Sequence, residues 1–258
     1  MAKNILLEIS YDGTDFCGWQ RQEKDRSVQG DLEAALQKLF GTEIPLQGSG
    51  RTDSGVHAKA QAATFLCPID SIPDANIPKA LNNFLPPDVR VNAAREVAQD
   101  FSARFSATSR VYRYFILPCQ IPQAAQNRFI WQIKSKPSLD ALNEMAACLR
   151  GETDCATFAA AGDASLSTKR YIESARFFEQ EDLFGQTLLV FEIEANAFLY
   201  RMVRSLTGTF IDFEKNGKGA EGFKKALEER DRKAAGPTAP PQGLFLWEVK
   251  FDGIRRHA

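Results

Sequence analysis

The residue types best suited to chemistry lie together in one polar stretch, residues 50–59, with the sequence GRTDSGVHAK. It sets the carboxylate of Asp53 beside the guanidinium of Arg51 and close to the imidazole of His57, with glycine on either side of the acid. Glycine takes positive φ and lets the backbone approach a ligand closely, so this composition is typical of a functional loop. Because a neighbouring guanidinium favours an ionised carboxylate, the stretch predicts a site built around a charged acid.

The same residues allow other interpretations. A glycine-rich turn with Asp and Ser often only forms an Asx-turn or caps a helix. We expect no metal at Asp53 and His57, because the chain has only two His and no paired Cys spacing. A serine hydrolase using Ser54 is disfavoured, since its motif needs glycine where Thr52 and Val56 stand.

Two further segments combine arginine with aromatic residues. Residues 110–115, RVYRYF, alternate as in a strand, which places Arg110, Tyr112 and Tyr114 on one face. Stacking on an aromatic ring contributes about 1–3 kcal/mol per base and arginines hold phosphates, so this face is typical of RNA binding. A half-buried strand whose arginines extend to solvent is the alternative.

Residues 198–205, FLYRMVRS, are predicted to be helical, so that Arg201 and Arg204 are neighbours on one helical face. An arginine on an otherwise apolar helix is costly to bury without a partner, and we expect it to meet a carboxylate. Asp53 is a candidate, although the sequence alone does not show that the two meet.

Composition limits the class of protein. The chain has 258 residues, 44% of them hydrophobic, enough to bury a core as one large domain or two smaller ones. Its formal net charge of -1 gives no general attraction to nucleic acid, but Arg110, Arg201 and Arg204 lie in two acid-free segments, 101–115 and 195–210. No apolar run is long enough to span a bilayer and no secretion signal is visible, which favours a cytoplasmic protein. Five cysteines without a C-x-x-C pair agree with reduced thiols: Cys17, Cys67, Cys119, Cys148 and Cys155.

The elements that must position these residues follow from periodicity and punctuation. Strands are expected at 3–11, 60–66, 89–97, 110–117, 171–178, 187–195 and 244–251, and helices at 28–39, 76–84, 139–149, 196–212 and 221–235. Ser27 and Gly41 are typical of the start and end of the first helix. Strands follow strands more often than they alternate with helices, which predicts an α+β fold with a mainly antiparallel sheet. The element content suggests two similar halves, 1–105 with the Asp53 loop and 106–258 with Tyr112 and Arg204.

At this point the chain resembles the tRNA pseudouridine synthase A family. The resemblance covers almost the whole chain through motifs in order: YDG at 11–13, GWQ at 18–20, SVQ at 27–29, GRTDSGVHA at 50–58, LPPD at 85–88, ARF at 103–105, YRY at 112–114, NAF at 196–198, MVR at 202–204, PTAP at 237–240 and GL at 243–244. It implies isomerisation of uridine to pseudouridine at conventional positions 38, 39 and 40 of the tRNA anticodon stem-loop, without a cofactor. It also implies a homodimer, and two α+β halves around a central sheet with the active-site cleft between them.

The resemblance also implies roles for individual residues. Asp53 falls on the catalytic aspartate of the family, the nucleophile, and Arg204 on an active-site arginine paired with it. Tyr112 falls on the tyrosine that contacts the target base, and Arg51 on an arginine that contacts RNA or displaces a base. Arg201 stands where histidine is common, so its role is open.

Two rival functions use the same residues. A non-catalytic RNA-binding module would need the arginines and tyrosines but not Asp53. A hydrolase of a nucleoside or phosphoester would use Asp53 with His57 and would turn over small molecules.

Overall fold

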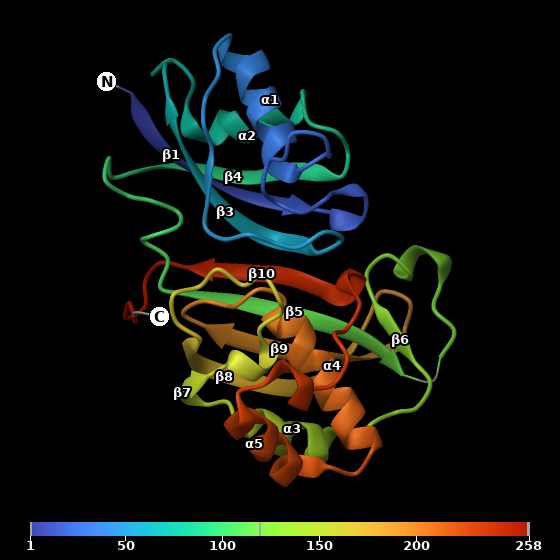
Figure 1. The fold of residues 1–258 in the computed structure, drawn as a ribbon. Helices are drawn as coiled ribbons and strands as arrows, with labels where there is room; N and C mark the ends of the chain where they lie inside the picture. Colours follow the sequence, from blue (N-terminus) through green and yellow to red (C-terminus); the bar gives the residue numbers. More distant parts are fainter. Residues whose placement is uncertain (1, 119, 257–258) are drawn as a thin grey trace. The chain divides into compact units, whose positions relative to one another are not determined.

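The computed structural model describes residues 2–118 and 120–256 and forms two compact units (Figure 1). Among the described residues, the first unit comprises 2–108 with 245–253, and the second comprises 109–118, 120–244 and 254–256. Each unit combines helices with strands that pair mainly antiparallel, which confirms the predicted α+β class. The last strand of the chain therefore belongs almost entirely with the first unit.

The sheet of the first unit has the strand order β4-β1-β3-β10. Its elements are β1 (Lys3–Tyr11), α1 (Val28–Phe40), β2 (Gln47–Gly48), β3 (His57–Cys67), α2 (Ile77–Asn82), β4 (Val89–Val97) and β10 (Leu244–Lys250). β1 pairs antiparallel with β3 and β4, whereas β10 joins β3 in parallel, Phe245 opposite His57. Figure 1 shows α1 and α2 on the same side of this sheet.

Helix α1 has the boundaries that its sequence predicts. The side chain of Ser27 caps its first turn, and Gly41 ends it in the left-handed region at φ 74°. Val28, Leu32 and Leu36 are completely buried along one stripe, so the helix is held by its apolar face.

The second unit has the strand order β5-β9-β8-β7, all antiparallel, with a short parallel strand beside β5. Its elements are β5 (Ser109–Pro118), β6 (Trp131–Ile133), α3 (Leu139–Ala147), β7 (Gly151–Asp154), β8 (Lys169–Glu181), β9 (Thr187–Ala195), α4 (Met202–Lys215) and α5 (Gly219–Glu229). Its core joins both layers through stacked and edge-on rings of Phe177 and Phe191 on the sheet with Phe210 and Phe223 on the helices, 4.7–5.4 Å between centroids.

The prediction for the helix at 196–212 was wrong at its start. α4 begins only at Met202, and Arg201 precedes it with φ 57°, so Arg201 and Arg204 do not share a helical face. The side chain of Asn196 accepts hydrogen bonds from the backbone N–H groups of Tyr171 and Ala197, and so joins the end of β9 to β8. The helix predicted at 221–235 also ends early, at Glu229.

The predictions about membrane-spanning segments and about the cysteines can be compared with the described residues. No described helix combines the length and apolar character needed to cross a membrane. The described cysteines, Cys17, Cys67, Cys148 and Cys155, are free thiols, and Cys119 lies outside the described residues.

Ion pairs between side chains join three neighbouring strands of the second unit, β5, β9 and β8. Glu192 on β9 accepts from Arg113 Nε at 2.7 Å on one side and from Arg176 Nη2 at 2.6 Å on the other. Burial alone would raise the pKa of Glu192, but the two arginines outweigh it and hold the pKa below its ordinary value of about 4.5. The resulting stabilisation is present above that value and is lost as the pH falls through the lowered pKa.

We expect Glu192→Gln to lower the free energy of unfolding by about 1–3 kcal/mol at pH 7, because it leaves two guanidinium groups without their shared charge. The difference from the wild type should shrink on acidification, when Glu192 is itself protonated. Urea unfolding at pH 7 and in acid measures both effects. Glu152→Gln, which removes an exposed pair with Lys169, is the control. A difference that does not depend on pH would contradict the role of the charge.

Candidate active site

Asp53 lies in a tight turn just before β3. Its carbonyl oxygen accepts a hydrogen bond from the N–H of Val56 at 3.1 Å, and Gly55 makes the turn possible with φ 75°. Asp53 is partly exposed, and Arg51 is exposed two residues before it. The turn therefore presents a carboxylate within reach of a substrate.

Both flanks of Asp53 are held by residues 16–19. The N–H of Trp19 donates to the carbonyl of Thr52 at 3.1 Å. The carbonyl of Phe16 accepts from the Ser54 hydroxyl at 3.1 Å and from the Gly55 N–H at 3.4 Å. Three hydrogen bonds within two residues of Asp53 thus fix its backbone before any substrate arrives.

This contact needs glycine because the two loops meet backbone to backbone. Gly18 has φ 113°, and a Cβ there would lie 2.6 Å from the carbonyl oxygen of Thr52. At Gly13 a Cβ would lie 2.0 Å from the carbonyl oxygen of Val56. The glycines of the YDG and GWQ motifs therefore allow the N-terminal loop to touch the Asp53 turn on both sides.

His57 anchors the end of the turn. Its ring is completely buried, Nδ1 accepts the N–H of Gly13 at 2.9 Å, and the ring stacks on Phe245 at 4.6 Å between centroids. A buried imidazole has no open side for a small-molecule substrate, which disfavours the hydrolase interpretation. In the part of the chain that the structure describes, no three His, Cys, Asp or Glu side chains gather as metal ligands would.

The start of the loop is fixed by a residue that the sequence analysis did not single out. Gln61 on β3 accepts from the Ser49 hydroxyl at 2.7 Å and donates to the carbonyl of Gly50 at 3.0 Å. Arg51 therefore projects from a segment that is held on both sides. Only the fold could reveal this role, because glutamine in a strand carries no sequence signal of its own.

Tyr112, the predicted base contact, lies on β5 in the second unit. Its side chain is 9% exposed. Its ring packs edge-on against the ring of Phe198, with 4.9 Å between the two ring centroids. β5 is buried on both faces, since Val111 and Phe115 on the opposite side are buried as well. Arg110 and Arg113 are half-buried, so the strand is packed on both faces while its arginines reach solvent in part.

Tyr114, two residues along, has a structural role. Its ring is completely buried and its hydroxyl donates to the carbonyl of Pro240 at 2.6 Å. Burial raises the pKa of this phenol, and the nearby charge of Arg204 offsets only part of the rise. Tyr114 therefore stays neutral and fastens the 237–240 segment to the sheet.

Arg204 lies in the first turn of α4 and is fixed by that same segment. Its Nε donates to the carbonyl of Ala239 at 2.9 Å, and its own carbonyl accepts the Ala239 N–H at 3.0 Å. Gly208, one turn later, has no space for a side chain, because a Cβ would lie 1.8 Å from the carbonyl oxygen of Pro237. The PTAP segment thus packs directly on α4 and orients a partly exposed guanidinium.

Two of the four predicted site residues lie in each unit, on backbone that is held by hydrogen bonds or packing. Arg51 and Asp53 share one loop of the first unit, and Tyr112 and Arg204 belong to the second. The pairing of Asp53 with Arg204 stays a prediction.

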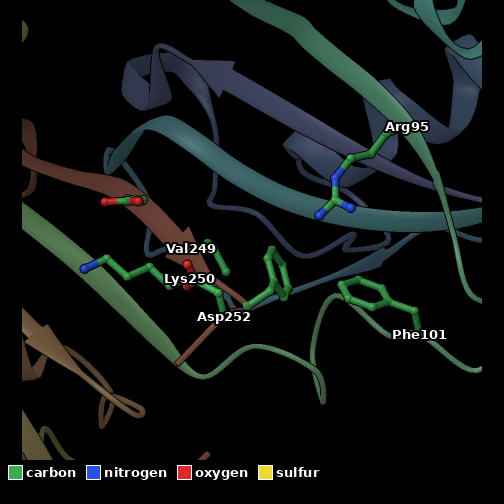
Figure 2. Close-up of a pocket in the computed structure, with 7 residues that line it drawn as sticks. Arg95, Phe101, Val249, Lys250 and Asp252 are labelled. Carbon is green, nitrogen blue, oxygen red and sulfur yellow. The ribbon is translucent and has the colours of Figure 1, made fainter. Parts of the chain in front are cut away.

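A hollow of about 520 Å³ lies elsewhere in the first unit, beside the end of β10 (Figure 2). Arg95, Phe101 and Lys250 are among the residues that line it. None of the predicted site residues contributes to it, so it does not belong to this site.

Comparison with known proteins identifies the class. Residues 9–106 and 145–252 match the family model for tRNA pseudouridine synthase. The chain therefore belongs to the tRNA pseudouridine synthase family, whose members are isomerases.

Relatives named tRNA pseudouridine synthase A cover nearly the whole chain. The protein of Treponema denticola is 52% identical, over 96% of this chain and 93% of its own length. That of Treponema pallidum strain Nichols is 45% identical, over 92% and 84%. That of Thermosipho melanesiensis is 38% identical, over 96% and 100%.

The close contact at Gly18 leads to a prediction. Gly18→Ala should lower the free energy of unfolding by about 1–3 kcal/mol, because the added methyl group overlaps the Thr52 carbonyl and φ is unfavourable. Gly50→Ala, with no atom within 4 Å of the added Cβ, is the control for stability. Equal urea midpoints for the two variants would show that the loops do not meet closely.

Proposed function

We propose that this protein isomerises uridine to pseudouridine at positions 38, 39 and 40 of the tRNA anticodon stem-loop, with Asp53 as the catalytic nucleophile. Membership of the tRNA pseudouridine synthase family supports the reaction class. The observation that carries the residue assignment is the Asp53 turn: a partly exposed carboxylate whose backbone is fixed by residues 16–19. A reacting group held in advance avoids the entropic cost of positioning it during the reaction.

The reaction explains why one carboxylate suffices. The C1′–N1 bond breaks, the uracil turns, and a C1′–C5 bond forms while C5 loses a proton and N1 gains one. Atoms and electrons balance without an oxidant or reductant, so no cofactor is required. Asp53 has three available routes: attack at C1′, attack at C6, or proton abstraction that gives a glycal-like intermediate. Each route needs the ionised carboxylate.

Arg204 is the proposed partner of that carboxylate. A guanidinium near a carboxylate favours the charged form of that carboxylate. The hydrogen bonds between Arg204 and Ala239 support this role, because they give the side chain one direction. Arg201, which stands at the N-cap position of α4 without a capping side-chain hydrogen bond, is left without an assigned role.

Tyr112 and Arg51 are the proposed substrate contacts. Extrusion of a base from a stem costs a few kcal/mol, which stacking and phosphate contacts offset. Tyr112 supplies a ring that is fixed on β5, and its hydroxyl is a candidate relay for the proton from C5. Arg51 is exposed and suited to the RNA backbone or to the place that the base vacates.

The setting follows from the same family resemblance. We propose a cytoplasmic homodimer with tRNA as its partner. The alternative is an RNA-binding module without catalysis. Such a module would bind tRNA equally well, but its function would not depend on Asp53.

The role of Asp53 gives the first prediction for activity. Asp53→Asn should abolish tritium release from tRNA transcripts that carry [5-³H]uridine while tRNA binding is kept, because the amide is neither nucleophile nor base. Glu43→Gln, an exposed acid before the same loop, is the matched control. Equal release by wild type and Asp53→Asn would move catalysis to another group. Binding without release by either protein would leave the RNA-binding module.

The role of Tyr112 separates into ring and hydroxyl. If the ring stacks on the base, Tyr112→Phe keeps most of the activity, while Tyr112→Leu weakens the bound state by about 1–3 kcal/mol, the cost of one lost stack. If the hydroxyl relays the proton, Tyr112→Phe already lowers kcat at unchanged tRNA affinity. Release rates at saturating tRNA, with filter binding, distinguish the two. Wild-type behaviour of both variants would contradict any role for this side chain.

A further inference from the structure

Arg26 lies outside the residues assigned to the site, yet it joins three segments of the first unit. Its Nη1 and Nη2 donate to the two carboxylate oxygens of Asp88 at 2.8 and 2.9 Å. Its Nε and Nη2 donate to Asp31 Oδ2 at 3.0 and 2.8 Å. The face of the same guanidinium covers the ring of Phe16, 4.1 Å from the centroid. One side chain thus uses its edge for two carboxylates and its face for an aromatic ring.

Phe16 connects this arrangement to Asp53. Its carbonyl oxygen accepts both hydrogen bonds from Ser54 and Gly55, the residues that follow the acid. The next residue, Cys17, donates its N–H to the carbonyl of Arg26 at 2.9 Å. Arg26 therefore holds both the ring of Phe16 and the peptide next to it.

The supports on the other side of Arg26 are themselves fixed. Asp31 lies in the first turn of α1. The backbone of Asp88, just before β4, accepts the N–H of Asp12 at 2.9 Å. A planar fork bound to two carboxylates has one orientation, which the point charge of a lysine does not reproduce.

We propose that Arg26 is a positioning residue for Asp53, acting through Phe16. It sets the place of the Phe16 carbonyl, and this carbonyl sets the direction in which the Asp53 turn presents its carboxylate. The inference rests on the proposed catalytic role of Asp53. Because a displacement of about 1 Å at a reacting group can cost about 100-fold in rate, the effect falls on turnover and leaves substrate binding intact.

The test compares Arg26→Gln and Arg26→Lys with Arg21→Gln. Arg21 is the matched control: it lies in the same loop, pairs with Glu33 of α1 at 3.1 Å, and its side chain is 70% exposed. Tritium release at saturating tRNA is measured per folded molecule, with the folded fraction from urea unfolding and tRNA affinity from filter binding. We expect Arg26→Gln to lower the rate about 10- to 100-fold and Arg26→Lys to restore only part of it, with Kd changed by less than about twofold. Arg21→Gln should match the wild type.

A second readout tests the route through Phe16. If Arg26 acts by holding this ring, the effects of Arg26→Gln and Phe16→Leu on the rate are not additive, and the double variant is little slower than the slower single one. Additive effects would overturn the proposed route.

Other outcomes overturn the inference directly. These are an unchanged rate at saturating tRNA, a loss explained wholly by weaker tRNA binding, and a loss that only follows the unfolded fraction. Asp53→Asn in the same assay separates the two proposals. If that variant still releases tritium, the proposed function fails whatever Arg26 shows. If it is inactive while the Arg26 variants match the wild type, only the positioning inference fails.

Discussion

The arrangement around Asp53 depends on hydrogen bonds between two loop backbones that are far apart in sequence. Residues 16–19 hold the turn at 52–55, and the same short segment receives the start of α1, since Gly18 and Trp19 accept the N–H groups of Val28 and Gln29 at 3.3 and 3.0 Å. The backbone of residues 16–19 therefore caps the N-terminus of α1 and also holds the turn that carries Asp53. Satisfying the buried peptide groups and fixing the carboxylate are thus one structural task.

In the second unit, side chains rather than loop backbones hold the candidate groups in place. The β5 strand is packed from both faces, and the Tyr114 hydroxyl fastens the 237–240 segment on which Arg204 depends. Tyr112 is left as a nearly buried ring on a strand, not as a loop residue. In both units the candidate groups project from backbone that is held by hydrogen bonds or packing, which is the condition for a preorganised site.

Local signals in the sequence were sufficient to predict many of the elements and the turn that carries Asp53. Ser27 and Gly41 marked the first helix, alternation marked β5, and the glycines of residues 50–59 marked the turn, because each depends on neighbours along the chain. The start of α4 was missed because Asn196 is used by β8, which no helical pattern reveals. The parallel pairing of β10 with β3 and the contact of Arg26 with Asp88 join residues distant in sequence, so they could be seen only in the fold.

The start of α1 has one more consequence. The amide groups at a helix N-terminus commonly form a ready anion site. Here Ser27 and the 16–19 carbonyls occupy the amides of residues 28–30, so the positive end of this helix is closed to an outside anion although it lies beside the Asp53 turn. The proposed contact with tRNA on this side would then fall to side-chain cations such as Arg51. Attraction of that kind weakens steeply as the salt concentration rises.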